Sequence, residues 1–275
     1  MTEEEETSFD TDIAVQPLGE GRFRAELSER WWVGGGPNGG YVAAIMLNAM
    51  GEVAAGVGPD QPPRSLTVHY LAAPSSGEAE VEVTVERAGR NTSFISARML
   101  QGGEVQAKAM AVFSVDRDGK VFDNSEMPEA PKPEECEEFD TELAPVAVFA
   151  RYRVMMAIGD MPLSGGKEAE SGGWIRLKED RPVTAELAAA ILDVWFPAPF
   201  VVLDSPGMAP TLEYTVHFPR RLPIDPDGEP DWMLLHLHVD ESTEGHFTED
   251  AELWTRDGTL VARSRQMALF RQVKG

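Results

Sequence analysis

The sequence predicts an α+β protein built from two strand–helix–antiparallel-sheet repeats, in which each curved sheet wraps around one helix. Two observations lead to this prediction. Each half of the chain has one apolar, helix-like segment followed by four strand-like segments. The two halves also end on related strings, AMAVF at residues 109–113 and QMALF at residues 266–270.

The two predicted helices span Gly39 to Val53 and Thr184 to Phe196. In both segments apolar residues recur every three or four positions, which is the spacing of one helix face. Thr184 suits the N-cap position. Pro197 ends the second helix, because proline lacks a backbone N–H and clashes with the preceding turn.

Apolar and polar residues alternate along the strand-like segments, as expected for half-buried strands. These segments are Arg64–Ala73, Ala79–Arg87, Thr92–Gln101 and Val105–Val115 in the first half, and Thr211–Phe218, Trp232–Asp240, Phe247–Thr255 and Leu260–Gln272 in the second. One further strand precedes each helix, at Arg22–Leu27 and Gly173–Leu177. Short turns favour antiparallel pairing, and we expect the two sheets to join, because joining hides two exposed edges.

The predicted boundaries are an acidic disordered tail at residues 1–10, a first repeat at 11–116, an acidic proline-containing linker at 117–149 and a second repeat at 150–275. The glycine-containing stretch 165–173 is expected to form a loop. The N-terminal residues are acidic and lack the basic region of a signal peptide, so we expect a cytoplasmic protein.

The chain has 47 acidic and 24 basic residues and a net charge of −23. This charge argues against nucleic acid or an anionic membrane as a partner, and no apolar run approaches the roughly 20 residues that span a membrane. Cys136 is the single cysteine and has acidic neighbours, which disfavour a catalytic thiolate. His236 and His238 share a strand face without a convincing third ligand, so no metal or other cofactor is expected.

Residues 34–39 fit the G-x-G-x-x-G pattern. We reject a dinucleotide site, because no βαβ unit follows and the downstream strands look antiparallel. The remaining feature is the pair Gly39 and Gly40, followed by Tyr41, at the start of the first helix. Its bare N–H groups are suited to bind a substrate carbonyl oxygen or anion. Alternatively, the glycines only permit close packing of the helix.

Several segments resemble the acyl-CoA thioesterase II-like family, whose members have a double hotdog fold. They are GGYVAA at residues 39–44, GWIR at 173–176, LEYTVHF at 212–218 and DGTLVARSRQ at 257–266. The resemblance covers roughly residues 9–271 and implies the same double hotdog fold here.

The resemblance also implies a catalytic set of Asp193, Thr211 and Gln266, which hold and polarise a water for attack on the thioester. The chain departs from the family pattern where Glu213-Tyr214 replace Asp-His and where residues 195–197 read Trp-Phe-Pro. Without the resemblance, Asp193 has a second interpretation, as part of a solvated helix face shared with Glu186.

The function implied by the resemblance is hydrolysis of acyl-CoA thioesters to free acid and coenzyme A, within lipid metabolism and without a cofactor. The helix-start amides would bind the oxyanion, and Arg220 and Arg221 are candidates for the coenzyme A phosphates. Two alternatives stay open: an enoyl-thioester hydratase, and a catalytically silent protein that binds acyl-thioesters or hydrophobic ligands. A homo-oligomer is expected by analogy with the fold.

The first repeat lacks the complete catalytic set that the resemblance implies for the second. Asn48, Ser65 and Ala109 are the predicted counterparts of Asp193, Thr211 and Gln266. We therefore expect one active site per chain, formed by residues of the second repeat.

Overall fold

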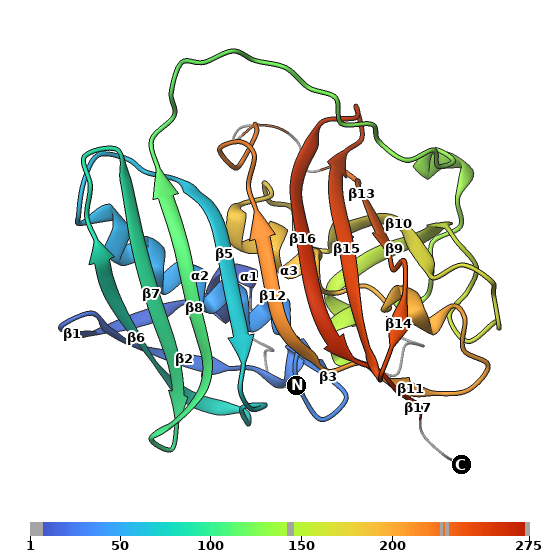
Figure 1. Cartoon of the computed structure of the whole chain (residues 1–275), viewed down its shortest axis with the longest axis horizontal. Helices are drawn as coiled ribbons and strands as arrows, with labels where there is room; N and C mark the ends of the chain where they lie inside the picture. The colour runs from blue at the N-terminus through green and yellow to red at the C-terminus, as the bar shows by residue number, and fades with distance from the viewer. Residues whose placement is uncertain (1–7, 142–145, 226–227, 229–230, 273–275) are drawn as a thin grey trace, which may run out of the picture.

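The computed structural model describes residues 8–141, 146–225, 228 and 231–272. Its main feature is one 13-stranded sheet that runs through both halves of the chain. Figure 1 shows the sheet curving around the helices α2 and α3, with the connection after β8 crossing over to the second half. The α-helices are α1 (Phe9–Ile13), α2 (Gly39–Ala55) and α3 (Ala185–Ile191).

The strands of the first half are β1 (Val15–Gly19), β2 (Arg22–Leu27), β3 (Trp32–Val33), β4 (Gly36–Pro37), β5 (Pro63–Tyr70), β6 (Gly77–Arg87), β7 (Thr92–Gln101) and β8 (Glu104–Ser114). Those of the second half are β9 (Tyr152–Ile158), β10 (Glu170–Leu177), β11 (Gly207–Met208), β12 (Thr211–His217), β13 (Met233–His238), β14 (Ser242–Thr243), β15 (His246–Thr255), β16 (Leu260–Leu269) and β17 (Arg271–Gln272). The predicted long strands are all present, with small shifts at their ends.

Both halves use the same strand order. The order is β2-β6-β7-β8-β5 in the first half and β10-β13-β15-β16-β12 in the second. The halves join where β5 pairs antiparallel with β12, and there the hydroxyls of Thr67 and Thr215 lie 3.0 Å apart. The prediction of a single continuous sheet is thus confirmed, and its edges at this joint are paired rather than exposed.

The bulges in the two halves change the predicted correspondence between them. The β5–β8 ladder shifts register between Pro63 and Ser65, and the β12–β16 ladder shifts between Thr211 and Glu213. Aligning these bulges puts Thr211 with Pro63 rather than with Ser65. The correspondence inferred from the sequence is therefore off by two residues. The alternation of apolar and polar residues does not reveal this error, because a shift of two keeps every side chain on the same face of a strand.

The predicted second helix is too long at its end. Thr184 is the N-cap, as expected, and its side chain accepts a hydrogen bond from the amide of Leu187. However, α3 stops at Ile191, and Asp193 lies in the turn that follows rather than in the helix. The amide of Asp193 contacts the carbonyl of Ala190 at 3.4 Å, so the bonding changes from i→i−4 to i→i−3 and tightens the last turn.

Three further expectations, about the N-terminal tail, one loop and the linker, differ from the structure. Residues 1–7 of the predicted tail lie outside the described residues, but Phe9 begins α1 and is fully buried against Trp31. The predicted loop at 165–173 ends early, because β10 already begins at Glu170. Part of the predicted linker also folds onto the second half, where the indole of Trp174 donates to the carbonyl of Pro131 at 2.7 Å.

Candidate active site

The start of α2 lies against the end of α3. Asn38 caps α2 by accepting a hydrogen bond from the amide of Tyr41 at 3.0 Å. A Cβ on Gly40 would lie 2.7 Å from the carbonyl oxygen of Ala189 and 2.9 Å from Cβ of Asp193. Only glycine permits this approach without displacing backbone, so the packing interpretation of the glycine pair holds.

The Asp193 carboxylate is bound to the start of α2. Its Oδ2 accepts hydrogen bonds from the amide of Gly40 at 2.7 Å and from Nδ2 of Asn38 at 3.0 Å. Nδ2 of Asn38 also donates to the backbone carbonyl of Asp193 at 2.8 Å. The helix-start amide that we expected to meet the substrate therefore donates to Asp193 in this structure.

Burial raises the pKa of the Asp193 carboxyl to about 6, although hydrogen bonds from Gly40, Asn38 and Gly39 act in the opposite direction. The residue as a whole stays partly accessible. A carboxyl whose pKa is raised toward neutral suits a general base.

Thr211 and Gln266 are in direct contact, as the predicted catalytic set requires. The hydroxyl of Thr211, at the start of β12, donates to Oε1 of Gln266 on β16 at 2.8 Å. Nε2 of Gln266 donates in turn to Oε1 of Glu249 on β15 at 2.6 Å. The second oxygen of Glu249 accepts the amide of Ala198 at 2.6 Å.

The Asp193 group and the Thr211 group are not joined by a hydrogen bond within the described ranges. Two tyrosines lie close to Asp193, the half-buried Tyr70 and the fully buried Tyr214. Tyr70 donates to the carbonyl of Gly39 and Tyr214 to that of Ala189, each at 2.7 Å. The charge of Asp193 contributes to the raised pKa of both tyrosines and of Glu249, although burial is the main cause in each case. The two groups are thus close enough to interact electrostatically.

The side chain of Tyr41, the third predicted substrate contact, belongs to the core. Its hydroxyl donates to the carbonyl of Asp12 at 2.9 Å, and its ring stacks on Trp31 with 5.1 Å between centroids. Burial is the main reason that its pKa is raised well above its ordinary value. The side chain therefore holds the start of α2 against the N-terminal segment.

Family models of known proteins match both halves of the chain. Residues 27–114 match the family model of the acyl-CoA thioesterase N-terminal domain, and residues 127–270 match that of the C-terminal domain. The chain belongs to the acyl-CoA thioesterase family. The resemblance stated from the sequence is confirmed.

Relatives of this thioesterase chain span nearly its full length. A solved protein of unknown function with a hot dog fold from Alicyclobacillus acidocaldarius has a TM-score of 0.88, 26% identity, and coverage of 98% of this chain and 99% of its own. The acyl-CoA thioesterase II TesB2 of Mycobacterium marinum has a TM-score of 0.76 and 20% identity, covering 98% and 100%, and this likeness shows the fold alone. An uncharacterized protein of Mycobacterium tuberculosis is 25% identical, covering 95% of this chain and 97% of its own.

Two polar residues of the candidate site were missed from the sequence. Asn38 stands directly before the helix start, where an asparagine is a common N-cap, so it was within reach of prediction. Glu249 shares the inner face of β15 with Phe247 and Ala251 and is only 1% exposed. A carboxylate at an inward position of a strand is an unusual feature that the alternation pattern alone could have revealed.

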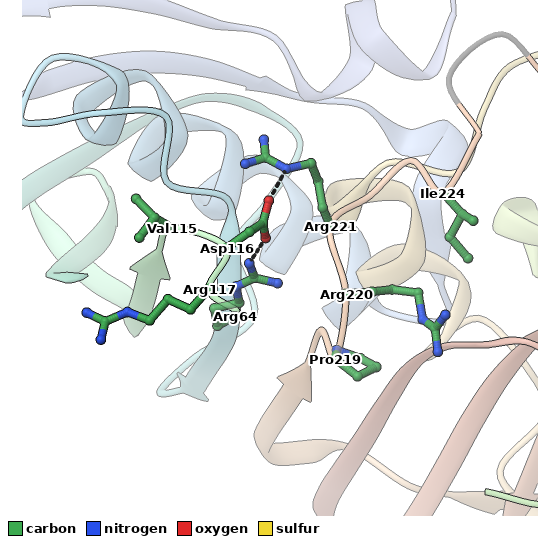
Figure 2. A pocket seen from close by; sticks show the side chains of 8 residues that line it. All are labelled: Arg64, Val115, Asp116, Arg117, Pro219, Arg220, Arg221 and Ile224. Atoms are coloured by element: carbon green, nitrogen blue, oxygen red, sulfur yellow. Dashed lines mark hydrogen bonds and ion pairs between the residues drawn. The ribbon is translucent and has the colours of Figure 1, made fainter. Parts of the chain in front are cut away.

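The arginines suggested for the coenzyme A phosphates lie at the other end of β12 from Thr211. Arg220 and Arg221 line a surface pocket of about 650 Å³ together with Arg64 and Arg117. Asp116 pairs with both Arg64 and Arg221, and Figure 2 shows Arg117 and Arg220 extending to opposite sides of it. Much of the positive charge is thus neutralised within the protein, and their role with coenzyme A stays a prediction.

The histidine pair on β13 is engaged in other contacts. Nε2 of His236 lies 2.8 Å from Oε1 of Glu170, and the rings of His236 and His238 stack with 5.5 Å between centroids. Among the residues with described positions, no group of three His, Cys, Asp or Glu side chains is arranged to hold a metal. None of the described helices is long and apolar enough to cross a membrane.

Proposed function

We propose that this chain hydrolyses acyl-CoA thioesters to free acid and coenzyme A, with Asp193 as the general base. The observation that supports this most is the anchored, buried carboxyl of Asp193. Two donors hold its Oδ2, and burial raises its pKa to about 6. Such a carboxyl is ionised at neutral pH yet basic enough to accept a proton.

In this proposal the water binds the other oxygen of Asp193, because Asn38 and Gly40 both donate to Oδ2. Thr211 and Gln266 orient the same water. The water oxygen bonds to the thioester carbon while its proton passes to Asp193. The C–S bond then breaks, and the proton on Asp193 goes to the departing coenzyme A thiolate.

The glycine pair has a different role from the one expected from the sequence. The single amide hydrogen of Gly40 is used by Asp193. We therefore assign the pair to placing the base, and not primarily to binding the oxyanion. Tyr70, which donates to the carbonyl of Gly39, supports the same turn from β5 of the first half.

The proposal also includes the finer fold and assembly. We propose a double hotdog, since both halves have the same strand order and the sheet curves around α2 and α3. The polar constellation of Thr211, Gln266 and Glu249 lies in the second half, which favours one site per chain. A homo-oligomer in the cytoplasm that acts in lipid metabolism remains part of this proposal.

The test is release of free thiol from a panel of acyl-CoA thioesters, from acetyl to stearoyl. We expect hydrolysis by the wild type and a loss of about 10²- to 10⁴-fold in kcat for Asp193→Asn, the range typical of a lost general base. Glu186→Gln, on the first turn of α3, is the matched control and should keep full activity.

Other outcomes would favour the alternatives. Binding of acyl-CoA without hydrolysis of any chain length would favour a silent binding protein. Full activity in Asp193→Asn would contradict the mechanism while leaving the function intact. Hydration of an enoyl-CoA would favour the hydratase, although no histidine is bonded to Asp193 in the described segments.

A further inference from the structure

Glu249 is the buried group that the mechanism above leaves without a role. It is 1% exposed, and each of its carboxylate oxygens receives one N–H donor at 2.6 Å, from Ala198 and from Gln266. Its inward neighbours on β15, Phe247 and Ala251, are apolar. Burying a carboxylate in such surroundings costs free energy, which its two hydrogen bonds offset only in part.

The position of this carboxylate decides how the amide of Gln266 is oriented. An ionised carboxylate only accepts hydrogen bonds, so Gln266 must turn its Nε2 toward Glu249. Its Oε1 then faces Thr211, 2.8 Å away, and can only accept. The Thr211 hydroxyl must therefore donate to Gln266, which leaves its oxygen lone pairs available to a further donor.

We propose that Glu249 is a positioning residue, which fixes the amide of Gln266 and thereby makes the Thr211 hydroxyl an acceptor for the attacking water. The role in catalysis rests on the proposed thioester hydrolysis. The orientation of the amide does not, since it follows from the hydrogen bonds alone.

The protonation state of Glu249 should control this arrangement. Burial raises its pKa to about 7, and the charges of Asp193 and Asp250 also favour the neutral form, while Ala198 and Gln266 stabilise the ionised one. Asp193 faces it from the turn after α3, Asp250 is on β15, and Tyr214 is opposite Gln266 on β12. A neutral Glu249 would donate a hydrogen bond to Oε1 of Gln266, which requires the Gln266 amide to reverse. Nε2 of Gln266 would then face Thr211, whose hydroxyl would accept from Gln266 instead of donating to it.

The decisive experiment compares Glu249→Gln with the exchange variant Glu249→Gln/Gln266→Glu. In the single variant the amide at position 249 must accept from Ala198 and donate to Gln266, so the Gln266 amide reverses. In the exchange variant a carboxylate at position 266 accepts from both position 249 and Thr211, so the original direction returns. We expect kcat to fall about 10- to 100-fold with little change in KM for the single variant, and to recover largely in the exchange variant.

Asp250→Asn is the matched control. Asp250 is the next residue on β15, faces outward and pairs with Arg265, and its removal should leave kcat unchanged at pH 8. Unchanged kcat in Glu249→Gln would overturn the proposal, as would an exchange variant that folds without recovering activity. If the single variant does not fold, the exchange variant decides alone.

A structural measurement separates this proposal from the proposed function. In NMR spectra, the Nε2 protons of Gln266 should gain contacts to the γ-methyl group of Thr211 in Glu249→Gln but lack them in the wild type. The same contacts in both proteins would overturn the positioning role, whatever the activity. Reversal of the amide in a protein that hydrolyses no acyl-CoA would support the orientation and contradict only the proposed function.

Discussion

Asp193 and Glu249 are two buried carboxyls with raised pKa values in one site. Burial raises the pKa of Asp193 to about 6 and that of Glu249 to about 7. Each is held by N–H donors that favour its ionised form, which limits the rise. Their exposure separates their roles, since residue Asp193 is partly accessible whereas Glu249 is enclosed.

The pH dependence of hydrolysis should reveal both carboxyls. We expect kcat of the wild type to fall as the pH drops below about 7, because protonation disables first Glu249 and then Asp193. In Glu249→Gln the remaining decline should begin only below about pH 6, where Asp193 takes up its proton. The measurement is the steady-state rate of hydrolysis between about pH 5 and 9, a range that spans the pKa values of both carboxyls. Identical profiles for the two proteins would contradict this assignment.

The raised pKa of Glu249 also predicts how stability varies with pH. Its ordinary pKa is 4.5 and its folded value is about 7, so between these values the folded state holds the proton more tightly than the unfolded chain. The free energy of unfolding should therefore fall as the pH rises through this window, by about 3 kcal/mol from this group. Glu249→Gln lacks this loss, so its stability relative to the wild type should improve between pH 5 and pH 8, an improvement of at most about 3 kcal/mol.

Urea unfolding of both proteins at the two pH values measures this effect. Asp250→Asn serves as the control, because its half-buried carboxylate faces outward and is paired with Arg265. An equal stability difference between Glu249→Gln and the wild type at both pH values would show that Glu249 does not titrate in this range.

At the scale of elements, the close approach of α2 to α3 sets the site. The approach depends on Gly40, whose added Cβ would meet the carbonyl oxygen of Ala189, Cβ of Asp193 and Cα of Ala190 at 2.7 to 3.0 Å. Tyr214 holds α3 from the sheet side by donating to the same carbonyl of Ala189. Asp193 is thus placed by the close packing of backbone and small residues, together with the side chain of Asn38.

Gly40→Ala should therefore damage both stability and activity. The methyl group must push α3 away, which disturbs the hydrogen bonds of Asp193, and we expect a loss of about 1 to 3 kcal/mol in the free energy of unfolding. Gly51→Ala on the same helix is the control, because its added Cβ meets nothing within 4 Å. It should be neutral or stabilising by about 0.5 to 1 kcal/mol. Thermal unfolding and kcat of both variants decide; equal effects would contradict the packing argument.

At the scale of the whole molecule, the two halves share one sheet and one core. The largest cluster of buried apolar side chains includes residues from both halves, such as Leu66 and Val68 on β5 and Tyr214 and Val216 on β12. The antiparallel ladder between β5 and β12 connects them directly. Neither half can therefore open along this joint without exposing core and unpaired backbone.

We expect the halves to unfold together. Amide hydrogen exchange in increasing urea should give one common opening free energy for β5, β8, β12 and β16, equal to that of global unfolding. The outer strand β1, whose residues are mostly exposed, should exchange at lower free energy and serves as the internal comparison. If β5 and β8 opened at lower urea than β12 and β16, the halves would be independent folding units.

The sequence predicted the elements because their patterns are local. Alternation in β7 and the glycine start of α2 depend on neighbouring residues, and both begin at the residue predicted. The candidates Thr211 and Gln266 came from the family resemblance, and the structure brings them together. The end of α3 was mispredicted, because its last turn changes hydrogen bonding without a clear change in the apolar pattern.

What the sequence determined by itself is therefore the ten long strands that the two halves share, the two helix starts and the family, whereas β1 and β9 were not predicted. Only the tertiary structure decided that Asn38 and Gly40 hold Asp193, 155 and 153 residues away, and that Glu249 orients toward Gln266. The physical reason is that a strand pattern specifies which face a side chain occupies, whereas the partner it meets depends on register, bulges and helix packing between distant segments.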